Sequence, residues 1–385
     1  MVANARMPSE RAQSLQVAKV AAAFERAGVS TTLLHARRNP TPTLPEGQDL
    51  FDYYGVPGGA RPSVVALPNL DLIDRFPTKA QFLPARIQEL SFASNAASWV
   101  RKQADDSWIL SRELETARSL VRSKKSAVFL EIHRVPAGRL RRKWLLEAAL
   151  GAQGVIAISG GVREDLEALG VPSDSITIEH DAVEAGQIAG MPERSAARVE
   201  LGISPDSKLV VYTGGLMTWK GVEHLIGAAW RLPKLEFVIA GGMKSDVERL
   251  RPLTQGLTNL RLDGFQAPER ISQYLAAGDL GVIPNRSTPD ISARYTSPLK
   301  AFESMAAGLP LVASELPSLR EILIDETHAV FVAPDSDEAL ADGIERLMGN
   351  QDLRESLASN GRARAKDISW DARAERLLTW MGARA

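Results

Sequence analysis

The feature that most constrains the fold is an alternation of short strand-like and helix-like runs in the second half of the chain. Strands are predicted at KLVVYTGG, LEFVIAGG, NLRLDG, LGVIPN, LPLVAS and HAVFVAP. Short apolar strands separated by helices are typical of a parallel sheet with crossover helices. The helix predicted at 221–230 has an apolar face formed by Val222, Leu225, Ile226, Ala229 and Trp230. We expect this face to be core and to pack on the sheet.

The first half repeats this pattern less regularly. Strands are predicted at STTLLHA, SVVAL, WILSR, AVFLEIH and GVIAIS, and a long helix at SERAQSLQVAKVAAAFERAG. Only MVANA precedes that helix, so either the first strand is brief or the given start lies late. The two halves together predict an α/β protein with two Rossmann-like domains.

The length of 385 residues favours two domains, because a single hydrophobic core rarely grows beyond about 300 residues. The segment EAGQIAGMPERSAARVELGISPDSK is rich in Gly, Pro and charge and predicts the boundary. We therefore predict a first domain at 1–185, a second at 186–367 and a final helix at 368–385. A cleft is expected between the domains.

Composition excludes several classes of function. With 46 basic and 47 acidic residues the net charge is −1, which gives no reason to expect nucleic acid as a partner. Cysteine is absent, so disulfides, thiolate metal sites and cysteine nucleophiles are excluded, and the five dispersed histidines predict no metal site. No apolar run approaches the roughly 20 residues of a membrane span, and the start lacks a signal-peptide pattern. We expect a cytoplasmic protein.

Motifs of several common enzyme classes are also missing. No GxGxxG follows an early strand, and GxxxxGK[ST], HExxH and GxSxG do not occur. Dehydrogenase, P-loop, zinc protease and hydrolase interpretations are therefore disfavoured.

The first candidate site is YTGGLMTWKGV, where Gly214 and Gly215 follow a predicted strand and Lys220 precedes a helix. Ligands of open α/β sheets bind beyond the carboxyl ends of the strands. Glycines let a ligand approach the backbone, and a lysine at a helix start adds positive charge suited to a phosphate. The alternative is an ordinary turn with a solvated lysine.

The second candidate is RYTSPLKAFESMAAGLPLVAS, at 294–314. Ser297 is expected to cap a helix and Pro298 to occupy its first position, which leaves free N–H groups near Thr296 to Leu299 as an anion cradle. Glu303 lies further along that helix and requires a partner, either Lys300 or ligand hydroxyls. The alternative is an intrahelical Lys300–Glu303 pair.

The third candidate is FLEIHRVP, a predicted strand that ends in Glu131 and His133. The histidine is placed to hydrogen-bond a substrate hydroxyl in the expected cleft. The alternative is a polar strand end that a neighbouring loop satisfies.

The segments TGGLMTWKGVEHLI, LEFVIAGG, LRLDGF, AAGDLGVIPN and SPLKAFESMAAGLPLVASELPSLREIL resemble, in this order, the nucleotide-binding half of retaining GT-B glycosyltransferases of family four (glycosyl transferases group 1). The resemblance covers roughly Lys208 to Asp367. In the first domain it rests mainly on architecture and EIH. It implies transfer of a sugar from a nucleotide-diphosphate donor with retention, without a required metal or other cofactor.

The resemblance also implies roles for single residues. Lys220 would hold the donor diphosphate and Glu303 the ribose hydroxyls, while His133 would touch the donor sugar near the reacting carbon. The phosphate site would be completed by Gly214, Gly215 and the N–H groups around Thr296, Ser297 and Leu299. The backbone around Gly264 and Phe265 would edge the base.

The chain departs from the family pattern at two positions. Tyr295 replaces a glutamate eight positions before Glu303, and Gly215 replaces an arginine that contacts phosphate. Arg294 or Lys300 is a possible substitute for the missing arginine. The donor sugar and the nucleotide base stay open.

Two further interpretations stay open: a GT-B-like epimerase or hydrolase of nucleotide sugars, and a catalytically silent scaffold. The acceptor is expected to be a glycan, a lipid or a small molecule. The stretch RLRRKWLLEAALGA from Arg139 combines basic residues with Trp144, Leu145 and Leu146. It predicts peripheral contact with the inner membrane face, or else a solvated helix face above a core stripe.

Overall fold

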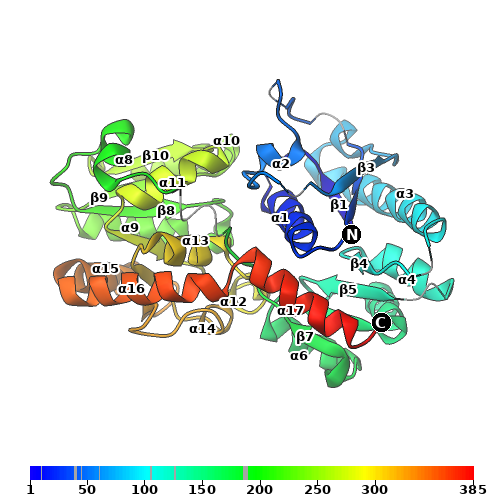
Figure 1. Ribbon diagram of the computed structural model, residues 1–385. Coiled ribbons are helices and arrows are strands. Elements are labelled where there is room, and N and C mark those ends of the chain that lie inside the picture. The colour runs from blue at the N-terminus through cyan, green and yellow to red at the C-terminus, as the bar shows by residue number, and fades with distance from the viewer. Residues whose placement is uncertain are drawn as a thin grey trace. The chain divides into compact units, whose positions relative to one another are not determined.

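The computed structural model describes the chain except residues 10, 39, 40, 45, 60, 105, 125, 126 and 185–189, and except the side chains of residues 78, 268 and 269. The chain forms two compact units: unit 1 is Met1–His180 with Trp370–Ala385, and unit 2 is Asp181–Ser369 (Figure 1). The predicted division after residue 185 falls at 185–189, outside the described residues.

Unit 1 is built on a parallel sheet with the strand order β3-β2-β1-β4-β5-β6-β7. Its strands are β1 (Val2–Arg6), β2 (Thr32–Ala36), β3 (Ser63–Leu67), β4 (Ile109–Ser111), β5 (Val128–Ile132), β6 (Gly154–Ala157) and β7 (Ile176–Ile178). The five strands predicted at 30–159 are confirmed. The sequence missed β7, whose three residues are too few to show a period. Strand β1 is five residues long, an ordinary length for a strand.

The helices of unit 1 are α1 (Ala12–Arg26), α2 (Leu50–Tyr53), α3 (Phe82–Arg101), α4 (Leu114–Arg122), α5 (Arg139–Gly151), α6 (Gly160–Leu169) and α17 (Trp370–Gly382), with short 3-10 turns at Ile73–Arg75, Thr78–Ala80 and Ser173–Ser175. The last helix, α17, packs against α1 (Figure 1). Its Trp380 ring lies 6.0 Å from the ring of Phe129 in β5. The final helix is therefore part of the core of unit 1.

Unit 2 is built on a second parallel sheet with the order β10-β9-β8-β11-β12-β13. Its strands are β8 (Leu209–Thr213), β9 (Glu236–Ala240), β10 (Leu260–Gly264), β11 (Leu280–Ile283), β12 (Leu311–Ser314) and β13 (Ala329–Val332). Every strand predicted in this half is confirmed. The chain reverses its direction across the sheet between β8 and β11, which is the position where such sheets bind ligands.

The helices of unit 2 are α8 (Arg194–Leu201), α9 (Val222–Arg231), α10 (Lys244–Leu250), α11 (Pro268–Ala277), α12 (Asp290–Ala293), α13 (Leu299–Ala307), α14 (Pro317–Arg320), α15 (Asp337–Gly349) and α16 (Gln351–Asp367), with 3-10 turns at Thr218–Lys220 and Arg251–Thr254. Alternate residues of β8 face opposite sides. Val210 and Tyr212 pack with α9 and α15, whereas Leu209 and Val211 pack with α8 and α11. Helices therefore cover both faces of the sheet.

The apolar face predicted for α9 is confirmed except at its last position. Val222, Leu225, Ile226 and Ala229 are buried, but Trp230 is 52% exposed. At 100° per residue, Trp230 lies about 80° around the helix from Val222, at the margin of the face. Its indole N–H points to the carbonyl of Leu253, 3.4 Å away. The prediction that Trp230 belongs to the core is wrong.

Among the helices of the described residues, none is both long and apolar enough to cross a bilayer.

Candidate functional site

The loop after β8 combines glycines with close backbone packing. Gly214 and Gly221 both have positive φ angles, +125° and +65°, which side chains rarely tolerate. A Cβ atom on Gly221 would also collide with the carbonyl oxygen of Pro284, in the loop after β11. These glycines allow the loops after β8 and β11 to approach each other closely. The 3-10 turn between Gly214 and Gly221 carries Lys220.

Lys220 is buried, with 9% of its surface exposed. Its Nζ atom lies 4.0 Å from the centre of the Trp219 ring. Burial lowers the pKa of Lys220 from 10.5 to about 7. The solvated lysine of the alternative interpretation is therefore not what the structure contains.

Lys300 is a second buried lysine at the same edge. Its Nζ lies 3.6 Å from the centre of the Tyr212 ring and has no hydrogen-bond partner among the described residues. A Cβ atom on Gly214 would lie 3.6 Å from this Nζ, so the ammonium group lies against the loop after β8. Burial and the charge of Lys220 hold the pKa of Lys300 well below its usual range, although the charge of Glu303 opposes them. Two lysines that repel each other in a buried site favour an anionic ligand between them.

The start of α13 differs from the prediction. The helix begins at Leu299, after Pro298, and Ser297 does not cap it. The Ser297 hydroxyl instead accepts a hydrogen bond of 2.8 Å from the backbone N–H of Asp181, which lies beside it in the fold. Thr296 and Ser297 are both buried. In the first turn the N–H of Ala301 donates to the carbonyl of Pro298 at 2.9 Å, while the N–H groups at a helix start have no carbonyl four residues earlier within the helix.

Glu303 lies one turn after Lys300 on α13 and is half-buried. The Lys300 ammonium group lies against Tyr212 and has no hydrogen-bond partner among the described residues, although the charge of Glu303 acts to raise the pKa of Lys300. Of the two candidates to replace the arginine missing at Gly215, Lys300 lies beside Gly214. Arg294 instead lies 5.5 Å from the Tyr295 ring centre and 3.9 Å from the Asp290 carboxylate.

Asn285 is a site residue that the sequence did not reveal. It follows β11, is fully buried, and neither polar atom of its amide has a partner among the described residues. The next residue, Arg286, donates its N–H to the Trp219 carbonyl at 3.0 Å, so Asn285 adjoins the turn that carries Lys220. A buried amide without partners costs about 1–3 kcal/mol unless a ligand bonds to it. Its only sequence signal was its place after a strand.

Gly264 is the last residue of β10, two strands from β8, and Phe265 follows it. Gly264 has a φ of +66°, and its carbonyl accepts a 2.6 Å hydrogen bond from the N–H of Gly241. The Phe265 ring is 44% exposed, although large apolar side chains are usually buried. An exposed ring at a strand end offers a flat surface for a planar ligand.

His133 belongs to unit 1 and follows β5. Its Nε2 atom lies 2.6 Å from the guanidinium of Arg112 and 2.8 Å from the carboxylate of Glu131. Burial and the Arg112 charge lower the pKa of His133 to about 4, so the ring is neutral near pH 7. Burial alone would raise the pKa of Glu131, but Arg373 and Arg112 outweigh it and hold that pKa well below the usual range. The predicted contact of His133 with a donor sugar stays a prediction.

The part of the chain that contains the lysines and α13 matches a known family. Residues 193–364 match the model of the glycosyl transferases group 1. This part of the chain is therefore similar to the group 1 glycosyltransferases. The two parallel-sheet α/β units of the chain are those of the GT-B fold, as the resemblance predicted.

The relatives of this chain are distant. It is 26% identical over 233 residues to an uncharacterized glycosyltransferase of Methanocaldococcus jannaschii, a match that covers 56% of each chain. It is 27% identical to the alpha-D-kanosaminyltransferase of Streptomyces kanamyceticus, over 85% of this chain and 83% of that one. The match to the first of these relatives thus spans about half of its length.

Among solved structures, HepE of Anabaena in complex with UDP is similar with a TM-score of 0.76 and 15% identity, over 99% of this chain and 98% of HepE. At this identity the likeness shows the shared fold.

Proposed function

We propose that this protein is a retaining glycosyltransferase that moves a sugar from a nucleotide-diphosphate donor to an acceptor. The observation that carries the proposal is the pair of buried lysines, Lys220 and Lys300, at the carboxyl edge of the unit 2 sheet. An isolated cation is costly to bury, and a diphosphate would provide the negatively charged partner for both lysines.

The chemistry follows from where charge develops. Cleavage of the bond between the sugar and the diphosphate leaves negative charge on the phosphate oxygens. Lys220, Lys300 and the first N–H groups of α13 stabilise this charge as it appears, because they are fixed before the reaction begins. In this proposal Lys300 replaces the arginine that the family has at Gly215.

Other residues of the site position the donor. Glu303 accepts hydrogen bonds from the ribose hydroxyls, and Phe265 with Gly264 lies along the base. Neutral His133 hydrogen-bonds a hydroxyl of the donor sugar without adding charge near the reacting carbon. The acceptor hydroxyl gives its proton to the departing phosphate oxygen on the same face, which is how the configuration is retained.

The proposal includes no metal ion. Two lysines and a helix start already supply positive charge to a diphosphate. An excess of EDTA should therefore leave the rate of sugar transfer unchanged, and a loss that added Mg²⁺ restores would contradict this part of the proposal.

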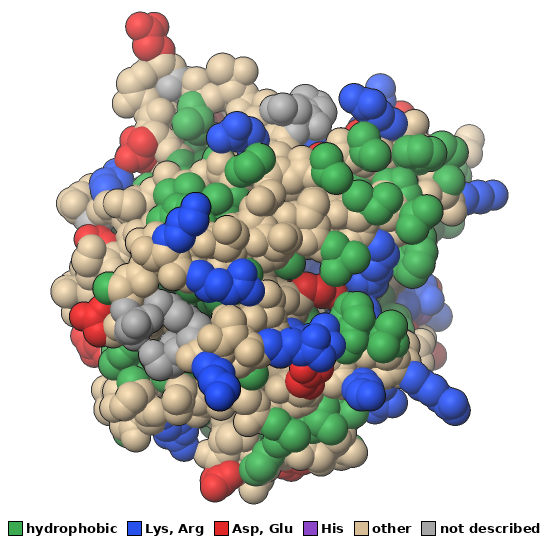
Figure 2. All heavy atoms as spheres, turned by 90° about the vertical axis from the view of Figure 1, so that its right-hand side faces the viewer, with side chains coloured by type: hydrophobic (Ala, Val, Ile, Leu, Met, Phe, Trp, Pro, Cys, Tyr) green, Lys and Arg blue, Asp and Glu red, His purple; other side chains and the backbone are tan. Residues whose placement is uncertain are grey.

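We also propose a cytoplasmic enzyme that touches an anionic membrane surface through α5. Arg139, Arg142 and Lys143 are exposed, and Leu140 is 60% exposed. Figure 2 shows Lys and Arg side chains beside hydrophobic side chains on the face of unit 1 where α3 and α4 lie, and α5 packs against α4. Leu145 does not contribute to this surface, because it is buried. The guanidinium group of Arg118 lies over the Trp144 ring, 4.7 Å from its centre. Failure to bind vesicles of anionic lipid at low salt would contradict this contact.

The first experiment incubates the purified protein with UDP-, GDP- and ADP-sugars without an acceptor, and measures thermal stabilisation and slow nucleotide release. HepE is in complex with UDP, which makes the UDP-sugars the first to test. Stabilisation by one nucleotide class supports the proposal and directs the acceptor screen. No response from a folded protein would contradict it and favour the silent scaffold, whereas a rearranged sugar nucleotide would indicate the epimerase.

A further inference from the structure

A polar cavity of about 370 Å³ lies in unit 1, outside the lysine site. It is lined by Arg37, Pro68, Asn69, Asp71, Asp74 and Arg75. These residues follow β2 and β3, so the cavity lies at the carboxyl edge of the unit 1 sheet, the edge at which His133 follows β5. Its volume is in the range of small-molecule sites. No sequence motif indicated it.

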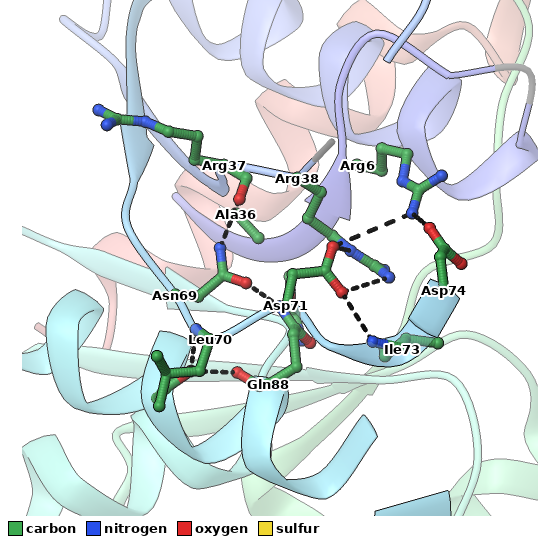
Figure 3. A network of polar contacts seen from close by, with 12 residues as sticks. Arg6, Ala36, Arg37, Arg38, Asn69, Leu70, Asp71, Ile73, Asp74 and Gln88 are labelled. Atoms are coloured by element: carbon green, nitrogen blue, oxygen red, sulfur yellow. Dashed lines mark hydrogen bonds and ion pairs between the residues drawn. The ribbon is translucent and has the colours of Figure 1, made fainter. Parts of the chain in front are cut away.

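The two carboxylates of the cavity are already neutralised. Arg38 holds Asp71 with two hydrogen bonds of 2.8 and 3.3 Å, and Arg6 donates to Asp74 at 2.6 Å (Figure 3). The hydrogen bond from Arg6, with the charges of Arg6, Arg38 and Arg11, lowers the pKa of Asp74. Neither carboxylate is therefore left to bind a cation.

Two guanidinium groups remain uncompensated. Arg37 donates to the carbonyl of Ala66 at 3.1 Å, and its side chain extends away from Asp71 (Figure 3). The Arg75 side chain has no hydrogen bond or ion pair within the described part of the chain. Arg6 and Arg38 already pair with the two carboxylates, so Arg37 and Arg75 on the cavity wall give it an excess of positive charge.

The wall of the cavity is held in place by amide hydrogen bonds. Asn69 donates to the Arg37 carbonyl at 2.8 Å and accepts from Gln88 at 3.1 Å. Gln88 is buried and exchanges two hydrogen bonds, of 2.9 and 2.8 Å, with Asn4. The amides of Asn4, Gln88 and Asn69 thus tie β1, α3 and the loop after β3 together. Such a preformed site loses little entropy when a ligand binds.

We propose that this cavity binds an oxyanion group, a phosphate or a carboxylate, carried by the acceptor, an assignment that rests on the proposed glycosyl transfer. Guanidinium groups match both oxyanions with paired N–H donors. A neutral acceptor would leave the excess charge of Arg37 and Arg75 without a counter-ion. The acceptor therefore belongs to the class of anionic sugars, cyclitols or lipid headgroups.

The test measures binding by calorimetry to the protein saturated with UDP, so that the lysine site is filled. The probes are glucose 6-phosphate, glucuronate, inorganic phosphate and neutral glucose. We expect the oxyanions to bind at least tenfold more tightly than glucose. The preference between the phosphate and the carboxylate probes identifies the group.

The double variant Arg37→Ala/Arg75→Ala should lose at least tenfold in affinity for the preferred anion. The single variant Arg75→Ala, which removes no contact of the described structure, should lose at least threefold. The matched control is Arg101→Ala/Arg122→Ala, at the ends of α3 and α4, which removes two exposed arginines of the same unit and should leave the affinity for the anions unchanged. Circular dichroism and UDP affinity verify that each variant is folded.

Affinities for glucose 6-phosphate and glucuronate that both equal the affinity for glucose, or unchanged anion binding in both arginine variants, would overturn the assignment. If UDP fails to bind, the proposed donor site fails on its own, and the same titrations in Lys220→Met still test the cavity. If UDP binds and no anion does, the cavity assignment fails while the proposed function stands.

Discussion

The ammonium group of Lys300 lies 3.6 Å above the ring of Tyr212, where it has no hydrogen-bond partner among the described residues. A cation above an aromatic face gains some of the energy that it loses by leaving water, though not all. Lys300 is therefore held in the free protein at a cost that an anionic ligand would offset.

Replacement of Lys300 by Met should stabilise the free protein and weaken nucleotide binding. The pKa of Lys300 is far below the 10.5 expected in the unfolded chain, so the buried lysine destabilises the fold at neutral pH. We expect unfolding to require about 1–2 kcal/mol more near pH 7, because an unsatisfied buried polar group is removed. The gain should become smaller as the pH approaches 10.5, where the unfolded chain also loses the proton and the pKa difference no longer contributes. A less stable Lys300→Met with unchanged UDP affinity would contradict both roles.

Replacement of Lys220 by Ala should lower turnover by about 10²–10³-fold, the usual loss when one group that stabilises developing charge is removed. The fold should stay intact. Lys234→Ala is the matched control, since Lys234 is exposed and precedes β9, at the opposite end of the strands. Wild-type rates in a stable Lys220→Ala would exclude a phosphate role for this lysine.

Binding of UDP should take up protons at pH 8. In the free protein the pKa of Lys220 is about 7, so Lys220 is mostly neutral at this pH, and the pKa of Lys300 lies well below its usual range. A bound diphosphate favours the charged forms and raises both pKa values. Affinity should therefore fall as the pH rises above 7. Calorimetry in buffers of different ionisation enthalpy measures the uptake, which Lys220→Met should reduce; proton release would be the contrary result.

Replacement of Glu303 by Gln should separate recognition of the ribose from recognition of the phosphates. Loss of a hydrogen bond to a charged group costs about 1.5–3 kcal/mol, so the affinity for UDP should fall about 10- to 100-fold. The affinity for inorganic pyrophosphate should not change, because it has no ribose. Equal losses for both ligands would assign Glu303 to the phosphate site or to folding.

Replacement of Arg373 by Ala should strongly destabilise unit 1. Arg373 is 1% exposed, and it donates to the carbonyl of His180 at 2.8 Å and to the carboxylate of Glu131 at 3.3 Å. Its loss leaves the buried charge of Glu131 with one arginine fewer, for which we expect about 3–5 kcal/mol. Arg376 lies on the same helix as Arg373 and forms an ion pair with Glu179 near the surface. Arg376→Ala should lower the free energy of unfolding by less than about 1 kcal/mol. Urea titrations of both variants compare the two losses.

The sequence by itself determined the two parallel sheets and most of their strands. Short apolar runs between helices are a local property, so β8 to β13 could be located without knowing their neighbours. Lys220 could also be singled out, because its signal is its place after a strand and before a helix. Strand β7 was missed because three residues are too few to show an alternating pattern. Trp230 was assigned to the core, but it lies at the margin of the apolar face of α9, where spacing alone does not determine burial.

Only the tertiary structure decided where side chains point and what surrounds them. The ammonium group of Lys300 lies over the ring of Tyr212, and Ser297 accepts from Asp181 rather than capping α13. Asn285 is buried with no partner among the described residues. Beside the polar cavity of unit 1, ion pairs connect Asp71 with Arg6 and Arg38, and these three residues lie at or just after the ends of three different strands. Burial, partners and pKa values depend on contacts between segments far apart in the chain, which a local period does not encode.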